Sequence, residues 1–319
     1  MVGRADEESG TNMMPGARTA TLKRLLVPLD GSGLAECVIP IAASLAAHLD
    51  ARVTLLYVME RQVHATVHGD RHLTDAPEAD AYLSEVSARM LAAGVVAERH
   101  VHPNQEGDVA KSIVDHAGDL AADLVILATH GGGGARRVLF GSVAQQVLRR
   151  GTRPVLLVRP PEAAEPAPFD VRRLLVPLDG QPPAEAALPY AATVAAAYGA
   201  EVLVARVVPT LATLAGDRIS AARLVPTAAA ASLDLEEEEA RRYTDAVVRD
   251  WAAGGGRIMA SVLRGEPAQT LLDLAAKTPV DIVVMATHGR AGLDATFSGS
   301  TASRIAGRVP VPLLLVRAS

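Results

Sequence analysis

The sequence predicts an α/β fold made of two tandem domains, each a five-stranded parallel sheet with helices on both faces. Three observations lead to this prediction. A stretch of about 150 residues occurs twice in the 319-residue chain, which is long enough for two domains with cores of their own. Short apolar runs alternate with longer helical patterns in each copy, as in βαβ units. Apolar residues make up 49% of the chain and aromatic residues 3%, which suits Val/Leu strands covered by Ala-rich helices.

The repeat is clearest where each copy begins. "RLLVPLDG" occupies residues 24–31 and recurs letter for letter at 173–180. Residues 35–58 match residues 184–207 at the same offset. Further along, the offset has grown by nine residues, which indicates an insertion in the second copy between residues 209 and 245. Two homologous domains explain this pattern better than a short-period repeat does.

The stretches outside the repeat divide the chain. We expect the first domain over residues 22–160 and the second over 171–319. The proline-rich segment 161–170 shows no helix or strand pattern, so it is interpreted as an extended linker. Residues 1–21 lack the apolar stretch of a signal peptide, and we expect a disordered tail there.

The elements of the first domain follow from its apolar runs. They predict strands at 24–29, 52–58, 95–101, 123–128 and 154–158. A first helix is expected over roughly 34–49, and a second should include residues 81–94 and end at Gly94 as the C-cap. A third is expected over 108–121, and a fourth from Ser142 onward. The second domain repeats this order. The insertion ends in an expected helix, "LEEEEARRYTDAVVRDWAAGGG", whose run of glutamates is interpreted as a solvated face rather than a metal site.

One motif follows the fourth predicted strand of each domain. "ATHG" stands at 128–131 and at 286–289, and each copy is followed after nine residues by Gly-Ser, at 141–142 and 299–300. Ligands of open parallel sheets bind beyond the carboxyl ends of the strands. Glycines allow close backbone approach, and a helix N-terminus offers aligned N–H donors. The motif therefore predicts an anion cradle, with phosphate as the usual anion.

Two other nucleotide motifs do not fit. A P-loop requires G-x-x-x-x-G-K-[ST], and no lysine follows a suitable glycine. A dinucleotide fingerprint would follow the first strand, but the chain has Asp30-Gly31-Ser32-Gly33 at that point.

With "RLLVPLD" and the spaced glycines in both halves, the sequence resembles the universal stress protein family in its tandem two-domain form, from about residue 22 to residue 318. ATP-binding members of that family carry G-x-x-G, nine residues and G-[ST] after the fourth strand, and an aspartate at the end of the first strand. The resemblance implies an adenine nucleotide alpha-hydrolase-like domain that binds ATP, with or without Mg²⁺, or stays empty. It also implies pairing of domains through the last strand.

The resemblance carries over to named positions. In the first domain it implies nucleotide contacts from Asp30, Val58, Ala128, Gly131, Gly141 and Ser142. In the second domain it implies contacts from Asp179, Val207, Ala286, Gly289, Gly299 and Ser300. Ala128 and Ala286 depart from the family motif, because each replaces its first glycine and adds a methyl group beside the expected nucleotide.

Several of these residues also have purely structural interpretations. Ser142 could cap its helix in a capping box with Gln145, and Asp30 could cap the first helix or form an Asx turn. His130 and His288 are interpreted as positioned loop residues rather than catalytic ones. His64, His68 and His72 would form a metal stripe on a helix, but Gly69 places them in a loop, so we expect no metal. Cys37, the single cysteine, is expected to be a buried thiol.

Together these observations predict an ATP-binding stress-response or signalling module with little or no turnover. No base, arginine finger or acidic Mg²⁺ pair is evident. The alternatives are a nucleotide-free interaction module and a slow ATPase. Expected partners are an adenine nucleotide, the other domain in an internal pseudo-dimer or a second chain in a homodimer, and an unknown protein. The net charge of −5 argues against nucleic acid, and the interrupted apolar stretches argue against a membrane. One cysteine suggests a cytoplasmic protein.

The loop after each ATHG motif differs in charge between the domains. The first loop contains Arg136 and Arg137 and no acid, whereas the second contains Arg290 and Asp294. Since a triphosphate is strongly negative, the loop charge favours tighter binding at the first site.

Overall fold

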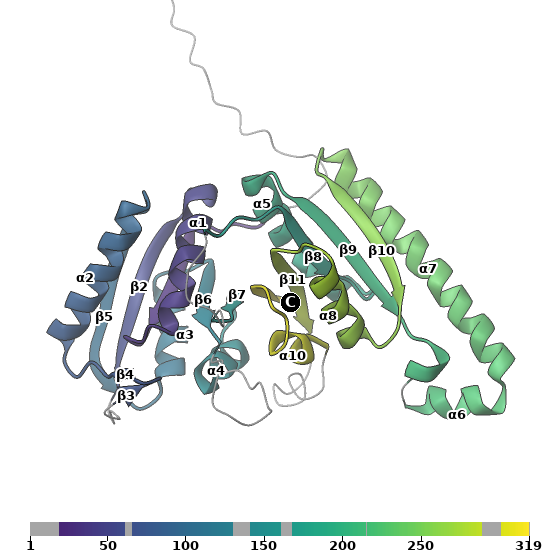
Figure 1. Ribbon diagram of the computed structural model, residues 1–319, viewed down its shortest axis with the longest axis horizontal. Coiled ribbons are helices and arrows are strands. Elements are labelled where there is room, and N and C mark those ends of the chain that lie inside the picture. Colours follow the sequence, from purple (N-terminus) through teal and green to yellow (C-terminus); the bar gives the residue numbers. More distant parts are fainter. Residues whose placement is uncertain are drawn as a thin grey trace, which may run out of the picture.

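The computed structural model describes residues 19–60, 66–129, 141–160, 168–214, 216–288 and 301–318 (Figure 1). The two copies of the repeat form two similar α/β halves. In chain order the first half consists of β1 (Arg24–Leu29), a 3₁₀ turn η1 (Ala35–Val38), α1 (Ile39–Leu49), β2 (Arg52–Glu60), a small hairpin of β3 (Thr66–Val67) and β4 (Asp70–Arg71), α2 (Ala76–Ala92), β5 (Ala97–Glu106), α3 (Val109–Asp119), β6 (Leu124–Ala128), α4 (Ser142–Arg150) and β7 (Val155–Val158).

The second half repeats this order and contains the predicted insertion. Its elements are β8 (Arg173–Pro177), η2 (Pro182–Ala187), α5 (Leu188–Tyr198), β9 (Glu201–Val208), η3 (Leu211–Thr213), α6 (Asp217–Leu224), α7 (Pro226–Ala253), β10 (Ile258–Arg264), α8 (Pro267–Lys277), β11 (Ile282–His288), α10 (Thr301–Ala306) and β12 (Leu313–Ala318). The insertion consists of η3, α6 and the beginning of the long helix α7, and α6 projects beyond the sheet (Figure 1).

The strands form one ten-stranded sheet, in the order β10-β9-β8-β11-β12-β7-β6-β1-β2-β5. In this sheet all strand pairs within one half are parallel, and the five strands of each half lie in the order third, second, first, fourth, fifth. The hairpin of β3 and β4 is a separate antiparallel pair. The halves meet where β7 and β12 pair antiparallel, with Leu156 opposite Leu314. Each of these strands would otherwise be an open apolar edge, and their pairing removes both edges.

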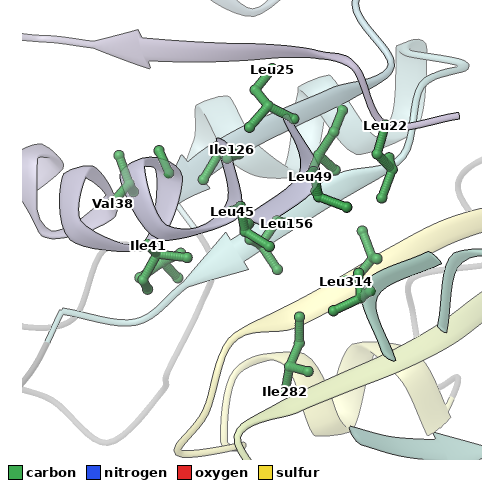
Figure 2. Packing of buried hydrophobic residues seen from close by; sticks show 14 of the residues in the cluster. Leu22, Leu25, Val38, Ile41, Leu45, Leu49, Ile126, Leu156, Ile282 and Leu314 are labelled. Atoms are coloured by element: carbon green, nitrogen blue, oxygen red, sulfur yellow. The ribbon is translucent and has the colours of Figure 1, made fainter. Parts of the chain in front are cut away.

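The core continues across this seam. Leu45 of α1, Leu156 of β7 and Leu314 of β12 belong to one cluster of buried side chains, together with Ile282 of β11 (Figure 2). On the opposite face of the sheet, Val155 and Leu315 share a second cluster. Because strands buried on both faces need apolar residues at every position, β7 reads Val-Leu-Leu-Val and β12 begins Leu-Leu-Leu-Val.

Polar contacts tie the two halves together away from the seam. Ser44 on α1 donates to the carbonyl of Phe169 at 2.7 Å and lies 2.8 Å from the hydroxyl of Tyr198 on α5. The rings of His48 and Tyr198 stack with centroids 3.9 Å apart. Thr193 of α5 also exchanges hydrogen bonds with Ala20, so the described start of the chain lies on the second half.

The main differences from the sequence prediction concern how helices begin. The first helix was expected as one piece from residue 34, but it starts as the 3₁₀ turn η1. Pro40 in the first turn of α1 has no N–H to donate to the preceding turn. The second helix was expected to include residues 81–94, and it begins at Ala76, where Asp75 caps it by accepting from Glu78 N at 2.8 Å. Its end agrees with the prediction, since Gly94 follows with φ +82°.

Candidate functional site

A cavity of about 240 Å³ opens in the second half beyond the carboxyl ends of β8, β9 and β11. It lies where the chain order of the sheet reverses, since β9 follows on one side of β8 and β11 pairs on the other. Its lining residues are Pro177, Leu178, Asp179, Ala184, Ala205, Val207, Pro267, Leu271, Met285, Ala286, Thr287, Thr301 and Ala302.

The chemistry of this lining is apolar with a few polar groups at the rim. Ala205 and Val207 of β9 and Met285 of β11 contribute apolar side chains to the lining. Asp179, Thr287 and Thr301 add oxygen atoms that can accept or donate hydrogen bonds. Such a combination suits a planar, largely apolar ring that carries polar substituents.

Asp179 is held in place by the turn that follows β8. Its Oδ1 accepts from Gln181 N at 2.8 Å, and Gly180 between them has φ +81°. This left-handed backbone conformation is strained for residues with a Cβ, so the position favours glycine. The turn thus fixes the aspartate at the cavity rim.

Asp30 makes the same kind of turn in the first half. Its Oδ1 accepts from Ser32 N at 2.9 Å and from Ser32 Oγ at 2.6 Å. The Asx-turn interpretation of Asp30 is therefore confirmed, whereas the helix-cap interpretation is wrong, because neither η1 nor α1 has a side-chain cap. Ser32 Oγ also accepts from Ala35 N at 3.1 Å. Turn formation uses one carboxylate oxygen and leaves the other for further contacts.

The β3–β4 hairpin contacts this turn in the first half. His68 Nε2 lies 3.5 Å from Asp30 Oδ2, and Asp70 Oδ2 accepts from Gly33 N at 2.8 Å. A Cβ on Gly31 would lie 3.1 Å from Leu73 Cγ, so the segment after the hairpin packs on the turn as well. In the second half, the segment after β9 instead runs through η3 into α6.

The two halves also differ at one wall position. Leu56 on β2 stands opposite Pro28, and Ala205 on β9 stands opposite the matching Pro177. Ala205 lines the cavity, and its counterpart Leu56 is the larger residue; both are buried. An equivalent slot in the first half would therefore be narrower by the extra volume of leucine.

Gly141 and Ser142 begin α4, but not as the capping-box interpretation expected. Gly141 is the N-cap, with φ −52° and ψ 143°, and its carbonyl accepts from Gln145 N at 3.1 Å. Ser142 is already the first helical residue and makes no side-chain cap, so that interpretation is wrong. The helix begins one residue too early for its hydroxyl to reach the required N–H group.

Ala128 is the last residue of β6, and the equivalent Ala286 lies within β11, two residues before its end. The neighbouring Thr129 N donates to Val158 O at 2.7 Å, and Thr287 Oγ1 donates to Val316 O at 3.3 Å. Ala286 lines the cavity, which is therefore open with the extra methyl group in place. Val58 and Val207, the other expected nucleoside contacts, lie in the last three residues of β2 and β9, and Val207 also lines the cavity.

Four expected contacts lie outside the described residues: Gly131, Gly289, Gly299 and Ser300. The same holds for His130, for the side chain of His288, and for both charged loops between the motif glycines. Their roles stay predictions.

The remaining sequence candidates have structural positions. His68 and Gly69 form the hairpin turn, with φ +51° and +93°, so the histidine stripe does not lie on a helix. His64 lies outside the described residues, and in the described part of the chain no three His, Cys, Asp or Glu side chains are arranged to hold a metal ion. Cys37 was expected to be buried but is half-buried, and burial raises the pKa of its thiol to about 12. Within the same residues, no helix has the length and apolar character needed to cross a bilayer.

Sequence reasoning missed two groups beside the aspartates. One is the His68 hairpin, for which the only signal is the two-residue His-Gly turn. The other lies on the far face of β9, where Arg206 stands 5.3 Å from the ring centroid of Tyr243, and Tyr243 donates to Glu185 at 2.8 Å. Burial, followed by the hydrogen bond to Glu185, raises the pKa of Tyr243.

Comparison with known proteins places these features in a family. The family model "Universal stress protein family" matches residues 21–159 and again residues 170–317. A universal stress protein from Mycolicibacterium smegmatis is 26% identical over 307 residues, which cover 94% of this chain and 99% of that protein.

The fold is similar to that of a universal stress protein structure from Archaeoglobus fulgidus DSM 4304. The TM-score is 0.66 at 21% identity, and the match covers 94% of this chain and 100% of the other. A structure of the universal stress protein from Archaeoglobus fulgidus in complex with dAMP matches 44% of this chain and 98% of its own, at 22% identity and a TM-score of 0.32. Its ligand is a property of that protein.

Proposed function

Because the chain belongs to the universal stress protein family, we propose that it binds an adenine nucleotide, ATP, in the cavity of its second half. Binding would serve as the input of a stress-response or signalling module. The observation that carries this proposal is the cavity itself. It lies at the point where the sheet order reverses, and its lining includes Asp179, Val207 and Ala286, three of the contacts that the family resemblance implies.

The lining suggests how a nucleotide would be held. The apolar side chains of Ala205, Val207 and Met285 would contact the purine ring, and Asp179 would accept a hydrogen bond from a ribose hydroxyl or ring amine. Thr301 begins α10, so the N-terminal turn of that helix faces the same space. Gly289, Gly299 and Ser300 would then complete a phosphate cradle, with Mg²⁺ as an optional bridge.

The same lining supports binding with little or no turnover. Asp179 is the single ionisable residue among the described residues of the cavity wall, and its turn already uses one oxygen. Hydrolysis of ATP needs a group that positions water and charges that stabilise the transition state. We therefore propose a binding module rather than an ATPase.

We further propose that the two halves, residues 22–160 and 171–319, act as an internal pseudo-dimer in solution, joined by the linker 161–170 after a tail at 1–21. Support comes from the paired strands β7 and β12 and from the core that spans them. A cytoplasmic location is part of the proposal, and the single cysteine supports it. Small-angle scattering that shows two freely tumbling lobes would contradict the pseudo-dimer.

The test of nucleotide binding is a calorimetric titration of ATP into the full chain and two variants. Ala205→Leu places in the second half the residue that the first half has, and it should fill the slot and abolish binding there. Ala252→Leu makes the same change on the exposed face of α7 and should bind like the unmodified protein. The site is supported if ATP binds to the unmodified protein in the micromolar range and the Ala205→Leu variant loses that binding. No heat with any variant, and no nucleotide released on heating the purified protein, would favour the nucleotide-free alternative.

A further inference from the structure

One edge of the sheet is open and apolar. β10 ends the ten-stranded sheet, and β9 is its one strand neighbour in the described chain. Arg257 O accepts from Val202 N at 2.9 Å, and Gly265 N donates to Val208 O at 3.0 Å. Because alternate residues of a strand direct their N–H and C=O groups to the same side, the odd-numbered residues face β9. Ile258, Ala260, Val262 and Arg264 therefore direct theirs away from the sheet.

The side chains along this edge offer little protection against pairing. Residues 258–263, Ile-Met-Ala-Ser-Val-Leu, include no charge and no proline. Met259 is 48% exposed on one face of the strand, and Ala260 is exposed on the other. Natural edge strands usually carry charges, prolines or covering segments, since an open edge is a template for another strand.

The opposite edge of the same sheet shows the contrast. β5 carries Glu98, Arg99 and Glu106 within its sequence, and Pro103 removes one backbone N–H donor. The two edges come from equivalent strands of the two halves, because β5 and β10 are each third in order. One half thus carries the usual protection and the other does not.

We propose that β10 pairs antiparallel with β10 of a second copy of this chain, which joins two ten-stranded sheets across a twofold axis. We expect the partner strand to be a second copy of β10, because the strand is complementary to its own antiparallel copy. A twofold interface places one patch against its own copy. The register in which the seven-residue strand overlaps completely is centred on Ser261. It sets Ala260 opposite the partner's Val262 and Ile258 opposite the partner's Arg264, all of them residues whose backbone groups face outward.

The side chains fit this register on both faces. Met259 would lie opposite the partner's Leu263, and Ala260 opposite the partner's Val262, so the central cross-strand pairs are apolar. The charge at the strand end is compensated, because Arg264 is bonded to Asp234 and Glu237 of α7, each at 2.8 Å. The chain already closes two apolar edges in this way at the β7–β12 seam. This inference is independent of nucleotide binding.

The experiment is sedimentation velocity of the full chain over a range of concentrations, with three variants. Ala260→Pro removes an outward N–H without breaking the ladder to β9, since residue 260 faces away from it. Ala260→Thr changes the same side chain but keeps the N–H group. Met259→Lys adds a charge on the exposed face.

The unmodified protein and Ala260→Thr should form a dimer of twice 33.2 kDa, and Ala260→Pro and Met259→Lys should raise the dissociation constant at least tenfold. Circular dichroism should be unchanged in each variant; if Ala260→Pro misfolds, Met259→Lys decides alone. A monomer at the highest attainable concentration would overturn the proposal. A dimer that persists in both Ala260→Pro and Met259→Lys would also overturn it, and so would an oligomer larger than a dimer.

Discussion

Leu56 and Ala205 occupy equivalent positions in the two halves. The difference in size between these side chains can make the two copies of a site differ in nucleotide affinity. In the first half the loop charge favours tight nucleotide binding, because that loop contains two arginines and no acid. A unit charge contributes about 1 kcal/mol at 4 Å in water, and salt screens it. Excess volume in a packed site costs about 1–3 kcal/mol. We therefore expect the steric difference to prevail and the second site to bind more tightly.

The thiol of Cys37 provides a second test at the residue scale. Burial raises its pKa to about 12 from the usual 9. The thiolate, which is the reactive form, should therefore be scarce at pH 8, and a thiol reagent should modify the folded protein far more slowly than the unfolded one. The rate should rise steeply only as the pH approaches 12. Equal rates for folded and unfolded protein at pH 8 would show that the half-buried thiol is not protected.

At the scale of elements, the β3–β4 hairpin is the main structural difference between the halves. His68 and Asp70 lie on the turn that carries Asp30, so the hairpin competes for the carboxylate that a nucleotide would use. We expect the double variant His68→Ala, Asp70→Ala to bind ATP more tightly at the first site. The measurement is an ATP titration in the Ala205→Leu background, which removes the second site. A matched pair, Asp75→Ala and Glu78→Ala, would control for general weakening of this region, and unchanged first-site affinity would argue against competition by the hairpin.

The contact between α1 and α5 has a predictable pH dependence. Burial raises the pKa of Tyr198 to about 12, and the hydrogen bond with Ser44 acts in the opposite direction. A raised pKa means that the folded state favours the neutral phenol. Its contribution to stability is complete below pH 10 and is lost as the pH rises towards 12. Tyr198→Phe should cost about 1 kcal/mol at pH 8 through the lost hydrogen bond. It should also lose less stability than the unmodified protein between pH 10 and pH 12 in urea unfolding. An identical loss in both proteins would exclude Tyr198 as a source of alkaline sensitivity.

At the scale of the whole molecule, the shared core predicts that the halves unfold together. Leu45 of the first half and Leu314 of the second half belong to one buried cluster (Figure 2). The chain has one tryptophan, Trp251, and it lies in the second half. Leu45→Ala should cost about 2–5 kcal/mol and should shift the unfolding midpoint seen by Trp251 fluorescence, although the two residues are in different halves. A Trp251 transition that stays in place while circular dichroism becomes biphasic would show that the halves unfold separately.

The sequence predicts the architecture well because the same pattern of strands and helices occurs in both copies of the repeat. Apolar runs mark every strand of the first half to within a few residues, and the growth of the offset marks the insertion that contains α6 and the start of α7. The β3–β4 hairpin is different, because two-residue strands have no periodicity that a pattern could reveal. Its contact with Asp30 depends on how residues 66–73 fold back over β1. The difference between Leu56 and Ala205 is visible in the aligned repeat, but its meaning requires the cavity wall.

The central claim is that the nucleotide lies in the second half, and photocrosslinking tests it most directly. The full chain would be irradiated with an azido-adenine analogue of ATP, digested and analysed by mass spectrometry, with excess ATP as the competitor. Label that ATP suppresses should appear on peptides that contain the cavity wall, around Asp179, Val207 or Met285. Suppressible label confined to the matching peptides of the first half, around Asp30 and Val58, would contradict the account.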